Sequence, residues 1–108
     1  MKIYTKEELK KEKVGTIIYI EFSSNLDRMK GEGLAKITKN NVSQKRSSGT
    51  IDPDCFCAKF LEHENKGIYN NKDITTSYSL MPGKMDFDKC GYILKIFKVE
   101  EDEIPRSI

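Results

Sequence analysis

The sequence predicts an α+β domain that is mainly β: a small, partly open five- or six-stranded barrel, or a curled antiparallel sheet, with a short N-terminal helix. A chain of 108 residues suits one domain with a modest core. Two short apolar runs, residues 14–22 and 91–99, are rich in β-branched and aromatic residues and lie near the two ends of the chain. The segments between them are polar and carry turn-forming residues.

A short helix is expected over residues 6–11. Thr5 and Glu8 have the spacing of a capping box, in which each side chain bonds the backbone N–H of the other residue. Tyr4 and Leu9 stand at the positions of a hydrophobic staple. We expect this helix to be structural and to close one end of the sheet.

The two apolar runs are the best-specified strands. In the first, one face of the strand carries alternate residues, since side chains alternate with period two; these are Val14, Thr16, Ile18, Ile20 and Phe22. The second run has apolar residues on both faces, interrupted by Lys95 and Lys98. This pattern indicates a central strand that is covered on both faces, or one whose outer face meets a partner.

The chain between the two runs is less regular. Residues 31–33 predict a hairpin bend, and residues 34–39 a second strand with Ala35 and Ile37 facing inward. A long polar loop is expected over residues 40–52, and loops of this length in small domains are often functional.

Residues 52–67 fit two alternatives. As a helix, the segment would begin at Asp52 and Pro53 and end at Gly67. As a strand, it would turn one set of side chains one way (Phe56, Ala58, Phe60) and another set the other way (Cys55, Cys57, Lys59). The strand is favoured because the flanking segments are β-like, and residues 64–67 would then form a turn.

Toward the C-terminus, residues 75–80 predict a further strand and residues 81–84 a turn. Residues 100–108 are acidic and are expected to fray. The single domain, residues 1–108, therefore divides into an N-terminal cap (1–13), a β-rich core (14–99) and an acidic tail (100–108).

The net charge of +2 conceals an asymmetry, because residues 1–50 hold eleven Lys/Arg against six Asp/Glu. Part of this excess predicts a cationic surface on two loops and the strand between them, formed by Arg28, Lys30, Lys36, Lys39, Lys45 and Arg46. Such a surface would bind an anionic partner, either nucleic acid or an acidic groove on a protein. Tyrosines could add stacking surfaces if they lie nearby: Tyr19, Tyr69, Tyr78 and Tyr92. An ordinary solvated surface is the simpler interpretation.

The one group with metal-ligand chemistry comprises Cys55, Cys57, His63 and Cys90. Zinc takes four such ligands, and on a strand Cys55 and Cys57 would share a face, whereas on a helix they would not. The usual C-x₂-C spacing is missing, so small buried thiols are the favoured interpretation and no cofactor is expected.

Enzymatic signatures are missing from the sequence. It contains no phosphate-binding loop, no nucleophile elbow and no metalloprotease motif, and the lone His63 lies among polar residues. No window is long and apolar enough to span a membrane, and residues 1–14 are charged rather than a secretory leader. We expect a non-enzymatic, cytoplasmic protein with reduced thiols.

Residues 4–9 followed by residues 14–20 resemble small uncharacterised proteins of Firmicute phages and mobile elements, in which a capped N-terminal turn precedes the Val-Gly-Thr strand of an SH3-like or similar small barrel. The similarity covers about twenty residues and carries no functional residue over. The resemblance implies a phage context, in which proteins of this size inhibit host defence by binding.

Three functions follow as expectations. The first is a phage-type inhibitor that binds a host protein such as a CRISPR or other defence effector, or that sequesters a signal nucleotide. The second is a weak single-stranded nucleic-acid-binding module that uses the cationic loops. The third is a small zinc-binding protein. A homodimer formed through an exposed edge strand is compatible with each.

Overall fold

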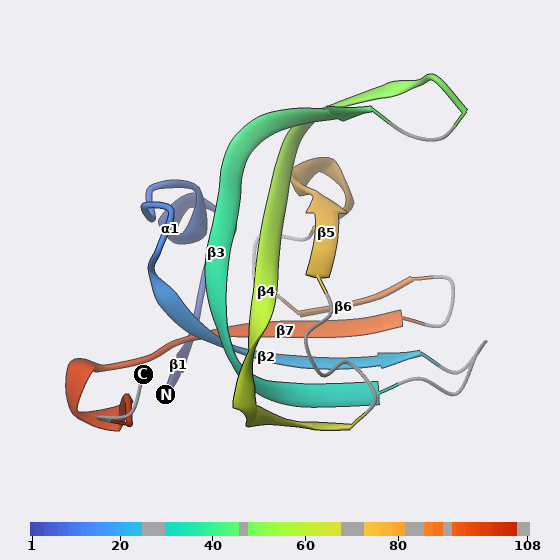
Figure 1. The fold of residues 1–108 in the computed structure, drawn as a ribbon. Helices are drawn as coiled ribbons and strands as arrows, with labels where there is room; N and C mark the ends of the chain where they lie inside the picture. The colour runs from blue at the N-terminus through green and yellow to red at the C-terminus, as the bar shows by residue number, and fades with distance from the viewer. Residues whose placement is uncertain (25–29, 46–47, 68–72, 82–85, 90–91, 106–108) are drawn as a thin grey trace.

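One antiparallel sheet dominates the computed structural model, which describes residues 1–24, 30–45, 48–67, 73–81, 86–89 and 92–105 (Figure 1). Its strands are β1 (Lys2–Ile3), β2 (Ile17–Ser24), β3 (Lys30–Lys45), β4 (Ile51–Gly67), β5 (Asp73–Ser77), β6 (Asp86–Lys89) and β7 (Tyr92–Lys98). The helical elements are α1 (Lys6–Lys10) and two short 3-10 turns, η1 (Tyr78–Leu80) and η2 (Glu101–Glu103). Six strands follow the order β1-β7-β2-β3-β4-β5, and β6 pairs with β7. The predicted mainly β, partly open antiparallel sheet with a short N-terminal helix is confirmed.

The curl of the sheet comes from its two longest strands, β3 and β4. The first part of β3 pairs with β2, and the middle of β4 pairs with β5, so the two ends of the hairpin lie in different parts of the sheet (Figure 1). Four register shifts interrupt the β3–β4 ladder. Because an extra residue on one strand bends it and increases its twist, these shifts let one hairpin turn from one part of the sheet to the other.

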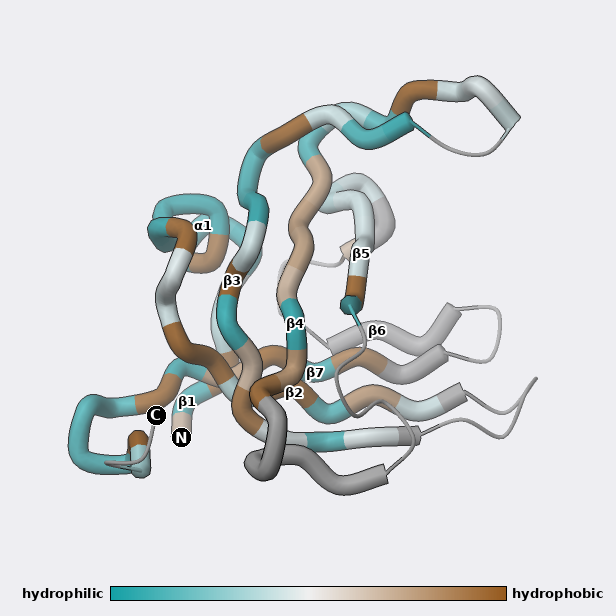
Figure 2. Tube along the Cα trace, in the orientation of Figure 1, coloured by the Kyte–Doolittle hydropathy of each residue, from teal (hydrophilic) through white to brown (hydrophobic). Residues whose placement is uncertain are grey.

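Beyond these bends the β3–β4 hairpin continues as a two-stranded arm, described for residues 42–45 and 48–54, that projects past β5 (Figure 1). The described residues of the arm are largely polar and exposed (Figure 2). The apolar Ile51 at its far end is also exposed, at 62%. Two non-glycine residues with positive φ mark its base, Asn41 (φ 55°) and Asp54 (φ 53°). Asn and Asp adopt this left-handed conformation more readily than other side chains.

The core lies on the inner face of the curled sheet and is closed by α1. Its largest fully buried side chains come from the N-terminal segment, from β2 to β4, from η1 and from β7; they include Tyr4, Leu9, Ile18, Ile20, Ile37, Phe56, Phe60, Tyr78 and Ile96. Ala35 and Ile37 are both fully buried, as the sequence predicts. Apolar segments of β2, β3, β4 and β7 accordingly line up in Figure 2 around this interior.

The N-terminal cap forms as expected. Thr5 Oγ1 accepts from the Glu8 N–H at 3.2 Å, and Glu8 Oε1 accepts from the Thr5 N–H at 3.1 Å. Tyr4 and Leu9 are 1% and 0% exposed. The hydrogen bonds from Thr5, followed by the nearby charges of Lys2 and Lys98, lower the pKa of Glu8.

The last apolar run becomes β7, which is central in the sheet but not fully covered on both faces, because Leu94 and Ile96 are buried whereas Lys95 and Phe97 are half-buried. It pairs with β2 on one side and with β1 and β6 on the other. The first run begins later than predicted, because Gly15 adopts φ 98° in a turn closed by the Thr16 N–H and the Lys13 carbonyl at 3.1 Å. Val14 is therefore outside β2 and is 63% exposed.

Four further predictions need correction. Residues 31–33 lie within β3 and form no bend, because β2 and β4 flank them on both sides. Residues 40–45 and 51–52 are strand rather than loop, and of the described residues between them only 48–50 lie outside the strands. Residues 64–67 continue β4 instead of turning, and residues 78–80 leave β5 as a 3-10 turn.

Three expectations remain, for residues 52–67, for the acidic tail and for residues 81–84. The strand interpretation of residues 52–67 is confirmed, since all of them belong to β4. In the acidic tail, residues 101–103 form an ordered turn in which Glu103 Oε1 accepts from the Glu100 N–H at 3.1 Å. Of the predicted turn over residues 81–84, only residue 81 lies among the described residues.

Candidate anion-binding face

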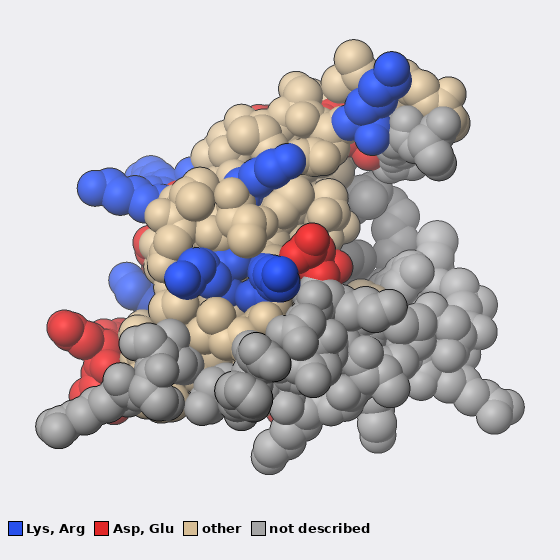
Figure 3. Space-filling model, in the orientation of Figure 1, with Lys and Arg blue, Asp and Glu red and all other residues tan. Residues whose placement is uncertain are grey.

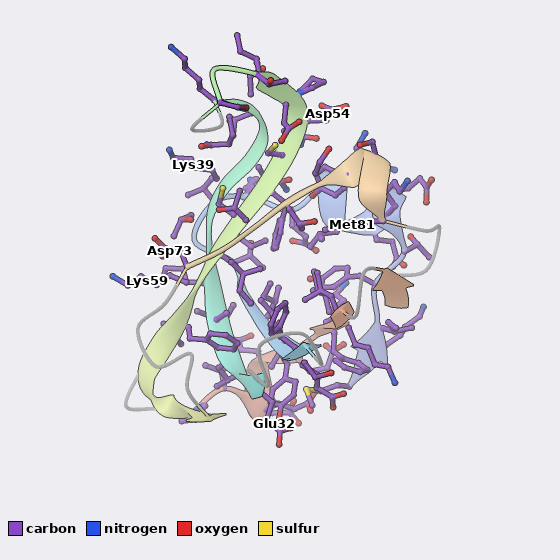
Figure 4. All side chains as sticks on the ribbon, turned by 90° about the vertical axis from the view of Figure 1, so that its right-hand side faces the viewer. Glu32, Lys39, Asp54, Lys59, Asp73 and Met81 are labelled. Carbon is purple, nitrogen blue, oxygen red and sulfur yellow. The ribbon has the colours of Figure 1, made fainter. Side chains whose placement is uncertain are left out.

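Three lysines gather on the outer face of β3 and β4, turned away from the core (Figure 3). Lys36 lies directly opposite Lys59 in the ladder, and Lys39 follows further along β3. All three are exposed, and Figure 4 shows Lys39 and Lys59 projecting from the same side of the hairpin. We call Lys36, Lys39 and Lys59 the lysine face.

A bulge in β3 is what brings Lys39 to this face. With strict period-two alternation, Lys39 would share the inner face with the fully buried Ile37. The register shift between Ile37 and Lys39 gives β3 one extra residue, Thr38, which resets the alternation. Lys36 and Lys39 therefore both project outward.

Among the described residues, one carboxylate neighbours the lysine face, and it forms no ion pair with a lysine of that face. Lysines directly opposite each other in a ladder repel, and such pairs destabilise a sheet. Among the described residues, no ion pair involves Lys36, Lys39 or Lys59. The exposed Asp73 of β5 stands opposite Lys59 on its other side and makes no ion pair with it (Figure 4).

A second cross-strand lysine pair lies elsewhere in the same sheet. Lys2 of β1 lies opposite Lys98 of β7, and both are exposed. The carboxylate of Glu8 is close enough for both lysines to contribute to its lowered pKa, after the larger effect of its hydrogen bonds with Thr5. Neither pair forms an ion pair among the described residues: Glu8 is the carboxylate near Lys2 and Lys98, and Asp73 is the one opposite Lys59.

Between the lysines the surface is made of small side chains. Cys57 stands opposite Lys39 and is 6% exposed, and Thr75 Oγ1 donates to its Sγ at 3.5 Å. Cys55 lies on the same face of β4, where its Sγ donates to the Asp52 carbonyl at 3.4 Å. Because the two cysteine side chains are short and buried and the exposed Thr75 is short, the lysine ammonium groups are the protruding features, as suits contact with a broad surface.

The predicted cationic set is only partly described. Lys36, Lys39 and Lys45 lie exposed along β3, with Lys45 on the arm opposite Ile51. Arg28 and Arg46 lie outside the described residues, as does the side chain of Lys30. Lys59 was not in the predicted set, although the favoured strand over residues 52–67 already placed it on the face of Cys57.

The stacking role expected for two tyrosines is not supported. Tyr78 is 2% exposed, its hydroxyl donates to Asn40 Oδ1 at 2.5 Å, and burial raises its pKa. The half-buried Tyr19 donates to Glu32 Oε2 at 2.7 Å and contacts Phe97 edge-on. The side chains of Tyr69 and Tyr92 lie outside the described residues.

The metal-site hypothesis involves residues that are only half described. Cys55 and Cys57 do share a face of β4, but the side chains of His63 and Cys90 lie outside the described residues. Within the described part of the chain, no three His, Cys, Asp or Glu side chains are grouped so as to hold a metal ion. In that same part, no helix is long and apolar enough to cross a membrane.

Comparison with known proteins adds no relative: no protein-family model, curated protein or solved structure matches this chain. The lysine face is therefore defined by the geometry of the molecule itself.

Proposed function

We propose that this protein is a non-enzymatic binding protein of the phage or mobile-element type, which docks its lysine face on an acidic surface of a host protein and inhibits it. The observation that carries the proposal is the exposed Lys36–Lys59 pair, held side by side in a rigid ladder without an ion-pair partner among the described residues. Stability is lost by keeping such a pair, and residues that lower stability are typical of functional surfaces. The expected host partner is a defence effector, CRISPR nucleases included.

An acidic protein surface suits this face better than single-stranded nucleic acid does. Proteins that bind single strands combine positive charge with aromatic side chains on which bases stack. Among the described residues, Tyr78 is buried, and the ladder neighbours of Lys39 are Cys57 and, beyond it, Thr75 rather than aromatics. Lysine also lacks the planar fork with which arginine binds phosphate. Charge complementarity to a protein needs only well-placed ammonium groups, which steer association and fix its orientation.

The proposal is tested by capturing partners from an extract of the bacterial host with tagged protein. Wild type is compared with K36E/K59E, which reverses the lysine face, and with K2E/K98E, which reverses another cross-strand lysine pair of the same sheet. Both variants change the net charge equally. We expect a stoichiometric host protein with wild type and K2E/K98E, and its loss with K36E/K59E.

Three results would count against the proposal. The first is that wild type captures no stoichiometric host protein. The second is that K36E/K59E retains the partner as well as wild type does. In a parallel measurement, tight binding of a fluorescent oligo-dT that is lost in K36E/K59E and falls steeply with salt would favour nucleic acid instead. Circular dichroism of each variant verifies that it is folded.

A further inference from the structure

A pocket of about 310 Å³ lies where the sheet meets the chain that follows β7. β2 lines it with Tyr19 and β3 with Glu32 and Leu34, while Val99 and Glu103 line it from the C-terminal segment. The lysine face contributes no residue to this lining. The pocket is therefore a separate site, and the inference from it does not rest on the proposed function.

The charged groups that line the pocket are mostly negative. Among the described residues that line it, Glu32 and Glu103 are the carboxylates, and none is Lys, Arg or His. The amino group of Met1 already lies 3.8 Å from Glu103 Oε2, so the rim holds one ammonium group. In the ladder, Glu32 stands between Glu21 of β2 and Lys66 of β4. Only the backbone of Lys66 is described.

Glu32 is held in place but has acceptor capacity left. The Tyr19 hydroxyl donates to its Oε2 at 2.7 Å, and the Tyr19 ring rests edge-on against Phe97 with centroids 6.2 Å apart. Glu32 forms no ion pair with a described residue. A carboxylate can accept several hydrogen bonds, so one donor from Tyr19 orients the group without saturating it.

We propose that this pocket binds the guanidinium group of an arginine side chain presented by another protein. A planar guanidinium offers five donors and can bridge carboxylates on two segments, here Glu32 and Glu103. Its methylene stem would pack on Leu34, which is 7% exposed, and on Val99. The Tyr19 ring adds an aromatic surface that favours a cation.

The pocket also adjoins the lysine face along β3. Glu32, Leu34 and Lys36 lie on the same side of β3, because every second residue of a strand faces the same way. In the regular β2–β3 ladder they stand opposite Glu21, Tyr19 and Ile17. From Glu32 to Lys36 the strand spans about 13 Å. A partner that carries an arginine beside an acidic patch would engage both sites at once.

The test uses Nα-acetyl-arginine amide as the probe, Nα-acetyl-citrulline amide as its neutral isostere, and putrescine as a diamine without a guanidinium. Binding is followed by amide NMR shifts of Gly33 and Val99 in the full chain. We expect saturable shifts with the arginine probe and none with the citrulline probe. Glu32→Gln should weaken binding about tenfold by removing the charged acceptor. Glu101→Gln, at an exposed carboxylate outside the pocket lining, should leave it unchanged.

Tyr19→Phe keeps the ring and removes the hydroxyl that orients Glu32, so weaker binding is expected there too. Equal shifts with the citrulline probe, equal affinity for putrescine, or full binding by a folded Glu32→Gln variant would each overturn the proposal. So would the absence of saturable shifts with the arginine probe. These outcomes are independent of the host capture, because none of the pocket variants alters the lysine face.

Discussion

At the scale of single residues, Asn40 connects the helix to the sheet. Its Nδ2 donates to the carbonyls of Leu9 and Glu12 at 2.9 and 3.0 Å, and its Oδ1 accepts from Tyr78. Leu9 lies in the last turn of α1 and Glu12 just beyond it, so these bonds tie the C-terminal end of α1 to β3. The neighbouring Asn41 caps the carbonyl of Lys10 in the same way, at 2.7 Å.

Replacement of Asn40 by Ala should therefore lower the free energy of unfolding by about 1–3 kcal/mol, because it removes a donor from the carbonyls of Leu9 and Glu12 and leaves the buried Tyr78 hydroxyl without its acceptor. Urea unfolding followed by circular dichroism measures the loss. Ser43→Ala, at an exposed position on the arm, is the control and should change stability by less than about 0.5 kcal/mol. A loss equally small for Asn40→Ala would show that this network does not hold α1.

Tyr19 is expected to make the stability of the protein depend on pH in the alkaline range. Its burial, followed by its hydrogen bond to the Glu32 carboxylate, raises the pKa of Tyr19 from 10.0 to about 12. The folded state therefore favours the neutral phenol, and this contribution to stability is complete below pH 10 and is lost as the pH rises from 10 through about 12.

Unfolding in urea at pH 9, 10 and 11 should accordingly show a steeper loss of stability for wild type than for Tyr19→Phe. Some pH dependence should persist in the variant, because the pKa values of Tyr4 and Tyr78 are also raised. Identical slopes for wild type and variant would mean that burial and the hydrogen bond to Glu32 do not raise the pKa of Tyr19.

At the scale of secondary-structure elements, the β3–β4 hairpin determines what the molecule presents to its surroundings. Its bulges bend the sheet, turn Lys39 outward and extend the arm beyond β5. The same ladder sets Lys36 opposite Lys59. A hairpin with regular register would bury Lys39 and remove one third of the lysine face.

Lys36→Glu should raise the free energy of unfolding by about 0.2–1 kcal/mol, because it exchanges a repulsive cross-strand pair for an attractive one while leaving Asp73 beside Lys59. The gain is measured by urea unfolding in low salt and should shrink in 1 M salt, where exposed charges are screened. Lys36→Gln, which removes the repulsion alone, should fall between the two. If Lys36→Glu destabilised the protein at every salt concentration, the lysines would not be repelling each other.

The elements differ in how far the sequence predicts them, for physical reasons. The Thr5–Glu8 cap and the two apolar strands depend on neighbouring residues, so local patterns suffice for them. The β3–β4 pairing depends on contacts between distant residues, and a bulge such as the one at Thr38 has no local signature in this chain. Lys59 was therefore missed as a partner of Lys36, and polar residues 40–45 were mistaken for loop because their strand is exposed.

At the scale of the whole molecule, the two faces of the sheet have separate tasks. The inner face holds the core from Tyr4 to Ile96 and is closed by α1. The outer face carries the carboxylate-lined pocket and the lysine face in succession along β3, between Glu32 and Lys39. A surface with both signs of charge in a fixed order selects partners by the order of their charges.

The most direct test of the account is the dissociation constant of the captured host protein, measured for wild type, K36E/K59E and K2E/K98E at low and high salt. We expect K36E/K59E to bind at least about tenfold more weakly than wild type at low salt, and K2E/K98E to stay within about twofold of wild type. The difference in affinity between K36E/K59E and wild type should narrow as the salt concentration rises. Equal weakening by the two variants, or none by either, would contradict the claim that the lysine face binds the partner.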